Sequence, residues 1–281
     1  MAGSRTAGSR FIDRLLDRIE AVGAPVCIGL DPVVDRLPAD IPGSSDAERV
    51  SRFCRDIIDS TAEYAAAFKP QSACFERLGS HGFRALEETL SHARAVGVPV
   101  IYDAKRGDIG STADHYAAAA VAMGVDAITI NAYMGPSTVQ PYLEAGLGVF
   151  ILIRTSNRDS GTIQSLQLAS GGSVSDAMAA MARSLGAEHR GAAGLSDLGA
   201  VVGLTKAAES AHLRERMPEQ VFLVPGYGAQ GGSPEDLEPL LGSVGLPGRG
   251  VIVNASRSVI YAEEPRDAAA RMRDDLVQTI R

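Results

Sequence analysis

The sequence has no tryptophan, no long apolar run, no block of like charges and only three cysteines. Cys27, Cys54 and Cys74 have neither disulfide-framework nor metal-site spacing, so we expect small buried thiols in a reducing compartment. No apolar run approaches the roughly 20 residues that cross a bilayer, which argues against a membrane protein. The net charge of −7 is spread along the chain, which argues against a nucleic-acid surface. These absences favour a cytoplasmic protein.

Short apolar runs recur along the chain, and each is followed by a stretch with helical spacing. The runs are continuous rather than alternating, which is typical of parallel strands covered by helices. A helix that ends near Gly23 precedes them, and residues 1–10 are expected to form a disordered or poorly ordered tail. Repeated strand–helix units of one composition predict an α/β fold, a parallel eight-stranded (β/α)8 TIM barrel formed as a single domain by residues 11–281. The predicted strands are Val26–Leu30, Ala65–Phe68, Val98–Tyr102, Ala127–Ile130, Val149–Ile153, Ala200–Leu204, Val221–Val224 and Gly250–Val253.

A doubly wound open sheet is the alternative architecture for this pattern. It would place a dinucleotide site after the first strand, and no Gly-x-Gly-x-x-Gly stands there. Helical spacing covers Glu48–Tyr64, Gly82–Ala95 and Ser111–Met123, as a barrel requires. The barrel is therefore the preferred prediction.

Charged residues gather where the first three predicted strands end. Asp31 follows the first strand, Lys69 the second, and Asp103 and Lys105 the third, with Asp108 in the turn beyond. Asp103 and Lys105 would point to the same side of a strand, and the carboxyl ends of a barrel open on one face. Because unpaired buried charges cost several kcal/mol, we expect one cluster in which opposite charges hold each other ionised. A structural salt-bridge network at the barrel rim is the alternative.

Two further strand ends predict a phosphate site. The glycine-rich turn Gly226–Gly232 would let backbone amides approach a ligand, and Ser256 and Arg257 after the last strand add an amide and a guanidinium. Loops after the seventh and eighth strands are the usual phosphate site of a barrel. A glycine-rich turn used only for chain reversal, with Arg257 as a surface charge, is the alternative.

Three other features near the strand ends have less definite roles. The long polar segment 158–175 predicts a functional or mobile loop, for which our hypothesis is a lid over the ligand. Lys206 follows the sixth predicted strand, where it could contact the ligand, although a structural role is the preferred interpretation. Tyr227 stands in the glycine-rich turn, where lining the phosphate loop and packing are equal accounts.

The segment Asp103–Ala113 (DAKRGDIGSTA) resembles the signature of the orotidine 5′-phosphate decarboxylase family. Lys69–Gln71 (KPQ) and Arg154–Asn157 (RTSN) are similar to its longer bacterial branch, the type 2 enzymes. Gly29–Pro32 (GLDP), Pro225–Gly232 and the arginine after the last strand extend the resemblance over nearly the whole chain. One departure is the sequence Arg158–Gly161 (RDSG), where the family has Pro-Gly soon after the asparagine.

The resemblance implies decarboxylation of orotidine 5′-phosphate to UMP and CO2 in pyrimidine biosynthesis, without a cofactor or metal. It implies a homodimer whose sites are shared across the interface. Lys105 would donate a proton to C6 of the pyrimidine, Asp103 would lie against the substrate carboxylate, and Lys69 and Asp108 would complete the charged array. The implied ligand contacts are Asp31 and Lys69 with the ribose hydroxyls, Ser156 with the pyrimidine edge, Gln230 and Arg257 with the phosphate, and Asp108 and Thr112 with the partner's site.

Other functions and roles compete with this one. A Schiff-base aldolase also uses a barrel lysine, but it needs that lysine neutral and away from carboxylates. Magnesium-dependent relatives would need an acid at the second strand end, where Lys69 stands, and an ammonium cannot bind a hard cation. A non-enzymatic sensor of a sugar phosphate or nucleotide is the third alternative. Ser111 and Thr112 also have a plain explanation as helix N-caps.

Overall fold

The described part of the chain forms eight strands in one parallel sheet. The computed structural model describes residues 9–228, 231–242, 248 and 250–280. Strands pair in the order β2-β1-β8-β7-β6-β5-β4-β3, and single parallel bridges, Phe68 with Val100 and Gln71 with Asp103, join the outer two. The sheet therefore closes into a TIM barrel with a weak seam, as predicted, and the open sheet is excluded. The strands are β1 (Val26–Leu30), β2 (Ala67–Pro70), β3 (Ile101–Arg106), β4 (Ala127–Ile130), β5 (Gly148–Arg154), β6 (Ser196–Val202), β7 (Gln220–Pro225) and β8 (Val251–Ala255).

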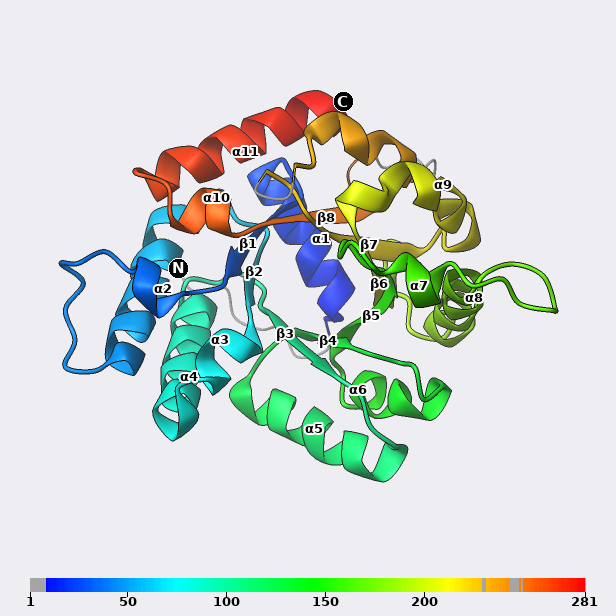
Figure 1. The fold of residues 1–281 in the computed structure, drawn as a ribbon, viewed down its shortest axis with the longest axis horizontal. Coiled ribbons are helices and arrows are strands. Elements are labelled where there is room, and N and C mark those ends of the chain that lie inside the picture. The colour runs from blue at the N-terminus through cyan, green and yellow to red at the C-terminus, as the bar shows by residue number, and fades with distance from the viewer. Residues whose placement is uncertain (1–8, 229–230, 243–247, 249, 281) are drawn as a thin grey trace.

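Helices surround this ring of strands (Figure 1). Each main strand-to-strand connection returns the chain across the outside, so the outer strand faces and the inner helix faces share one apolar core. The α-helices are α1 (Phe11–Val22), α2 (Asp46–Thr61), α3 (Ser72–Glu76), α4 (Gly79–Ala95), α5 (Gly110–Met123), α6 (Gln140–Glu144), α7 (Gly161–Gln164), α8 (Val174–Gly186), α9 (Ala207–Arg216), α10 (Arg257–Ile260) and α11 (Pro265–Ile280), and the 3₁₀ turns are η1 (Val34–Arg36), η2 (Pro136–Thr138), η3 (Leu204–Lys206) and η4 (Pro234–Leu240).

A second apolar cluster fills the inside of the barrel. The helix α1 lies across the middle of the strand ring in Figure 1 and contributes Phe11, Leu15 and Ile19 to this cluster. The Phe11 ring meets that of Phe150 edge to face, with centroids 6.0 Å apart. A Cβ at Gly148 would lie 2.1 Å from Phe11 Cδ1, so β5 must begin with glycine there. The first helix thus plugs the amino-terminal end of the barrel and leaves the other end open.

The predicted ends of helices and strands are correct at positions where the sequence changes from buried apolar residues to polar residues or glycine. The strands β1 and β4 have their predicted ends, and α1 ends at Gly23, whose left-handed φ of 80° suits glycine. The prediction of Ala200–Leu204 for the sixth strand was wrong, because the strand begins earlier, at the polar and buried Ser196. The third strand extends past its predicted end through Arg106, so Asp103 and Lys105 lie on the strand itself.

The structure describes only the end of the predicted tail. Of the tail expected at residues 1–10, Ser9 and Arg10 are described, and the Arg10 guanidinium pairs with Asp197 at 3.0 Å; the rest lies outside the described residues. No helix in the described ranges has the length and apolarity needed to span a bilayer.

The plug formed by α1 gives a stability prediction. We expect Phe11→Ala to lower the free energy of unfolding by about 3–5 kcal/mol, because Phe11 is only 1% exposed and its removal leaves a cavity. Chemical denaturation measures this value. Phe83→Ala is the matched control, since Phe83 is 45% exposed and its loss should change stability by no more than about 0.5 kcal/mol. Equal effects of the two substitutions would contradict the assigned role of α1.

Candidate active site

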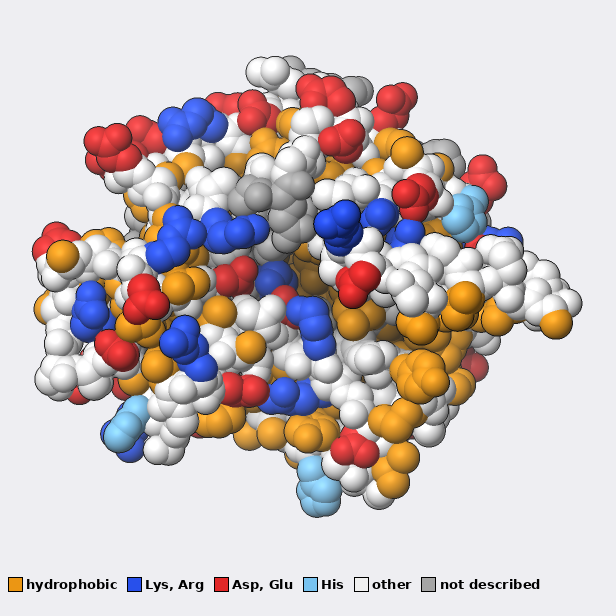
Figure 2. Space-filling model, in the orientation of Figure 1, with side chains coloured by type: hydrophobic (Ala, Val, Ile, Leu, Met, Phe, Trp, Pro, Cys, Tyr) orange, Lys and Arg blue, Asp and Glu red, His pale blue; other side chains and the backbone are white. Residues whose placement is uncertain are grey.

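A cavity of about 700 Å³ opens at the carboxyl ends of the strands. Figure 2 shows positive and negative side chains gathered around a hollow in the middle of this face. Of the residues predicted for the site, the cavity contains Asp31, Lys69, Asp103, Lys105 and Ser156. The barrel therefore brings together residues that lie far apart in the sequence, as its strand topology predicts.

The carboxylate of Asp103 is the centre of the charged cluster. Its Oδ2 accepts hydrogen bonds from Lys69 Nζ at 2.7 Å and from Gln71 Nε2 at 3.0 Å. Its Oδ1 accepts from Lys105 Nζ at 2.6 Å and from Thr129 Oγ1 at 2.7 Å. Asp103 is buried, and these donors from β2, β3 and β4 replace the water that the carboxylate has lost.

The two lysines keep Asp103 ionised. Burial alone would raise the pKa of the Asp103 carboxyl, but Lys69 and Lys105 outweigh burial and lower this pKa well below its usual range. Burial alone would likewise lower the pKa of Lys69, and the carboxylates of Asp103 and Asp31 raise it instead. Both members of the buried pair are therefore charged over the whole neutral range.

The lysines differ in what they offer to a ligand. The side chain of Lys69 is 5% exposed and lies beneath the cavity, whereas that of Lys105 is 46% exposed and presents its ammonium to the cavity. Asp31 Oδ1 lies 3.9 Å from Lys69 Nζ and has no hydrogen-bond partner among the described residues, although the atom is buried. The cavity thus contains an available ammonium and an unsatisfied carboxylate oxygen.

Lys105 adopts an unusual backbone conformation. Its φ of 46° makes it the one non-glycine residue with positive φ in the described ranges. Such a conformation costs about 1–3 kcal/mol and is typical of functional sites. The sequence argument from strand alternation predicted the correct contact between Asp103 and Lys105, but the strand is irregular at this point.

Asp108 and Thr112 are not among the residues that line the cavity. Asp108 Oδ1 accepts from the backbone N–H of Ile109 at 2.8 Å, and Thr112 lies in the first turn of α5. The prediction of Ser111 or Thr112 as the N-cap was wrong, because Ile109 is the N-cap and no side chain caps the helix. Of the predicted array, Lys69, Asp103 and Lys105 are in contact, Asp31 lies beside Lys69, and Asp108 is not among the residues that line the cavity.

The predicted phosphate side lies at the same end of the barrel. Arg257 is exposed and begins α10 directly after β8, although it is not among the residues that line the cavity. The neighbouring Ser256 Oγ is buried and has no hydrogen-bond partner in the described part of the chain. The glycine-rich turn contacts α10, since a Cβ at Gly228 would lie 3.0 Å from Ser258 Oγ. The predicted ligand residue Gln230 lies outside the described residues.

Tyr227 and Lys206 have partners away from the cavity. The Tyr227 hydroxyl donates to Asp275 Oδ2 in α11 at 3.0 Å, and Lys206 Nζ lies 3.9 Å from Glu209 Oε1. Neither residue lines the cavity described here. The structural role preferred for Lys206 and the packing role for Tyr227 agree with these contacts.

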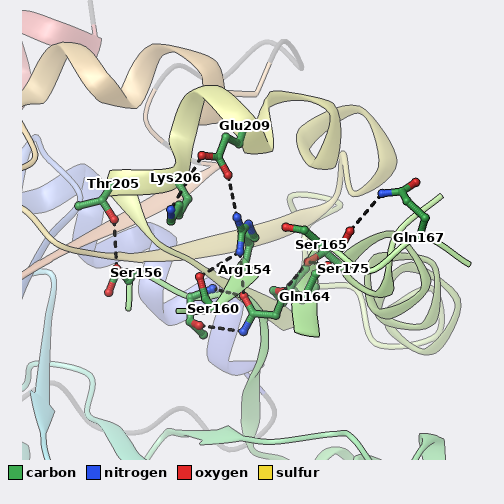
Figure 3. Close-up of polar contacts among 12 residues, drawn as sticks. Arg154, Ser156, Ser160, Gln164, Ser165, Gln167, Ser175, Thr205, Lys206 and Glu209 are labelled. Carbon is green, nitrogen blue, oxygen red and sulfur yellow. Dashed lines mark hydrogen bonds and ion pairs between the residues drawn. The ribbon is translucent and has the colours of Figure 1, made fainter. Parts of the chain in front are cut away.

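The segment 158–175 forms one wall of the cavity and contains the short helix α7. Figure 3 shows how this wall is attached to β5. The buried Arg154 guanidinium donates to Ser160 Oγ at 2.9 Å and to Glu209 Oε2 at 2.7 Å. The Gln164 side chain pairs with Thr155 twice, accepting from its N–H at 2.9 Å and donating to its Oγ1 at 2.8 Å. These contacts hold the wall beside Ser156.

Several cavity residues were missed at the sequence level. The apolar residues Leu152, Val201 and Leu223 face the cavity from successive strands, and Asn254 lies beside them on β8. Thr129 is a neutral residue within β4 and Gln164 a neutral residue within α7, so nothing in the local sequence distinguishes them from residues that only pack in the protein core. Period-two alternation places Thr129 on the same side of β4 as Ala127, which faces the barrel interior, and this was the one signal available.

Residues suited to bind a metal do not gather in the part of the chain that the structure describes. No group of three or more His, Cys, Asp or Glu side chains has the geometry of a metal site in the described ranges. At the second strand end, where a magnesium site would need an acid, the side chain is the buried ammonium of Lys69. The donor set of the cavity therefore does not suit a divalent cation.

The fold and the cavity together define a TIM-barrel enzyme with its reactive groups at the carboxyl ends of the strands. The sequence pattern of the Orotidine 5′-phosphate decarboxylase / HUMPS family matches residues 24–272. The chain belongs to this family.

Relatives that match over nearly the full length of the chain support this family assignment. An orotidine 5′-phosphate decarboxylase of Halobacterium salinarum is 44% identical over 275 residues, which cover 96% of this chain and 97% of that protein. One from Clostridium perfringens is 37% identical, covering 95% and 98% of the two chains. A crystal structure of a Toxoplasma gondii protein, described as an orotidine-monophosphate-decarboxylase, superposes with a TM-score of 0.87 at 36% identity, covering 96% of each chain.

The buried charge pair gives a prediction that depends on pH. We expect Asp103→Asn to lower stability by about 3–5 kcal/mol at pH 7, because Lys69 keeps a buried charge without its main partner. The raised pKa of Lys69 contributes stability that is present at neutral pH and is lost as the pH rises above the usual lysine range. The deficit of the variant should therefore shrink at high pH.

Denaturant unfolding from pH 7 to about pH 12, well above the usual lysine pKa of about 10.4, measures this deficit. Asp40→Asn is the control, since Asp40 is an exposed carboxylate and its loss should have little effect at any pH. A deficit for Asp103→Asn that does not change with pH would contradict the assigned pairing.

Proposed function

We propose that this protein decarboxylates orotidine 5′-phosphate to UMP and CO2, with Lys105 as the proton donor and without a cofactor. The contact that carries the proposal is the 2.6 Å pair of Lys105 Nζ with Asp103 Oδ1, placed at the open cavity. Decarboxylation by this family of enzymes belongs to pyrimidine biosynthesis. The structural salt-bridge alternative does not explain why one ammonium of the cluster is exposed to a cavity.

The reacting step needs a carboxylate and an ammonium in fixed positions. Breaking the bond between C6 and the carboxylate leaves its electron pair on a ring carbon with no conjugated sink. An ammonium close to C6 is favoured more as negative charge arrives there. The Lys105 ammonium then gives its proton to C6, which completes UMP, and the neutral amine takes a new proton from water.

Asp103 raises the free energy of the bound substrate before the reaction. Two charges about 4 Å apart interact by roughly 4 kcal/mol at an effective dielectric constant near 20. A substrate carboxylate beside Asp103 is therefore repelled by a few kcal/mol, and the repulsion ends when CO2 leaves. The apolar side chains of Leu152, Val201 and Leu223 suit the neutral CO2 better than the carboxylate.

The remaining polar groups are assigned to the nucleotide. Asp31, with its unsatisfied oxygen, and Lys69 bind the ribose hydroxyls, and Ser156 binds the pyrimidine edge. Arg257 binds the phosphate, and the buried unpaired hydroxyl of Ser256 supports an anion at this end. Gln230 is assigned to the phosphate from the family resemblance alone. The wall formed by 158–175 acts as a lid that excludes water from the pyrimidine.

We further propose that the protein is a homodimer with shared sites, and a member of the type 2 branch. Asp108 and Thr112 lie outside their own cavity, and exposed apolar side chains occur directly before α5 and in the segment between β4 and η2. Ile109 is 59% exposed and Tyr133 is 82% exposed. A two-fold interface here would cover this apolar surface and bring Asp108 and Thr112 to the partner's ligand. The type 2 assignment depends on KPQ and RTSN, and the cytoplasmic location stays a prediction from composition.

Turnover of orotidine 5′-phosphate, followed by its absorbance, tests the function directly. We expect Lys105→Ala to lower kcat by about 100- to 10,000-fold, because the variant loses the proton donor and its charge near C6. UMP binding should persist, because the residues assigned to the nucleotide remain. EDTA should leave the wild-type rate unchanged. An activity lost to EDTA and restored by magnesium would favour the metal-dependent relatives, and undiminished function of Lys105→Ala would favour a sensor.

A mixing experiment tests the shared sites. Lys105→Ala and Asp108→Asn should each be nearly inactive alone. In a mixed dimer of the two variants, one site contains both substitutions and the other contains neither. Co-expression should therefore restore about a quarter of the wild-type rate if subunits pair at random. A mixture no more active than the single variants would show that Asp108 does not serve a partner's site.

A further inference from the structure

We infer that Thr129 is a positioning residue that sets the conformation of Lys105 and fixes its ammonium against Asp103. This inference depends on the proposed decarboxylation, because it concerns the proton donor of that reaction. Thr129 lies in β4, is 1% exposed and faces the cavity beneath the reacting groups. Its side chain is uncharged, and its two hydrogen bonds go to Lys105 and Asp103, so we assign it an effect on the positions of these two residues.

The pairing of β3 with β4 is interrupted at this residue. Tyr102 pairs with Ile128 and Arg106 pairs with Ile130, so three residues of β3 face Thr129 alone. Regular pairing resumes beyond, where the N–H of Asn131 donates to the carbonyl of Arg106 at 2.7 Å. Two extra residues in β3 thus form a bulge, and bulges re-aim side chains near active sites.

The Thr129 hydroxyl replaces the missing backbone acceptor in this bulge. Its Oγ1 accepts from the backbone N–H of Lys105 at 3.0 Å. A φ of 46° at Lys105 is uncommon for a residue with a side chain, and it takes the Lys105 N–H out of the regular strand pairing. The hydrogen bond therefore satisfies the backbone in the conformation that turns the Lys105 side chain into the cavity.

The same hydroxyl also holds the acid. Thr129 Oγ1 donates to Asp103 Oδ1 at 2.7 Å, and this oxygen also accepts from Lys105 Nζ at 2.6 Å. The hydroxyl thus joins the Lys105 backbone to Asp103 Oδ1, which is the same oxygen that accepts from the Lys105 ammonium. Accepting from one group and donating to another uses both capacities of a hydroxyl.

If Thr129 served only for packing, the variants that keep its shape and those that keep its hydroxyl would behave differently from our expectation. Thr129→Val keeps the shape of the side chain and removes both hydrogen bonds, whereas Thr129→Ser keeps the hydroxyl and removes the methyl group. Loss of the hydroxyl leaves the charges of Lys105, Lys69 and Asp103 in place but frees the Lys105 ammonium to move. A misplacement of 1 Å costs about 100-fold in rate.

Steady-state kinetics of the three proteins tests the inference. We expect Thr129→Val to lower kcat by about 100-fold, with KM and UMP affinity close to the wild-type values. Thr129→Ser should keep most of the wild-type kcat. Amide hydrogen exchange at Lys105 should be faster in Thr129→Val, since its N–H loses its acceptor. Thr129→Ala gives the same comparison if the valine variant does not fold.

The outcomes separate this inference from the proposed function. A wild-type protein without decarboxylase activity would refute the function itself. An active wild type with an equally active Thr129→Val variant would refute the inference and leave the function standing. A serine variant as impaired as the valine variant, or a parallel loss of UMP affinity, would assign Thr129 to packing.

Discussion

The Asp103 carboxylate, buried between two ammonium groups, is the interaction on which the rest of the site depends. A buried carboxylate is tolerated only when donors replace its water, and Asp103 has four, from Lys69, Gln71, Lys105 and Thr129. Lys69 lies on β2 and Gln71 directly follows it, so their hydrogen bonds to Asp103 join β2 to β3 at the seam of the barrel. The Asp103 carboxylate therefore both links the two strands at the seam and holds the Lys105 ammonium at the cavity.

The two sides of the cavity have different physical tasks. One side carries fixed charges on rigid strands, so that stabilisation of a developing negative charge needs no rearrangement during the reaction. The other side is a wall of chain from 158–175, attached to β5 through Arg154 and Gln164 and supported from behind by Glu209. Apolar residues form the floor between them. The rigid strands hold the charged groups in fixed positions. The wall is a surface segment, which tolerates sequence change, so it can differ from the family pattern at Arg158–Gly161 (RDSG).

The accuracy of the sequence-based prediction varies between elements for physical reasons. The helix α1 and the strands β1 and β4 were predicted well, because their ends coincide with glycine, charge or loss of apolar residues. The strand β6 was misplaced because buried polar residues at its start, Ser196 and Asp197, resemble a loop. The end of β3 was misplaced because the charge of Asp103 is buried by partners on other strands, which no local pattern reveals.

The sequence by itself determined the barrel and the cluster of Asp31, Lys69, Asp103 and Lys105, because strand periodicity and position at a strand end are local properties. Only the tertiary structure decided that Thr129 and Gln164 belong to the site. Thr129 meets Asp103 across 26 positions of sequence, and its importance comes from the bulge opposite it. A neutral side chain acquires such a role through contact in space, and that contact exists only once the strands have paired.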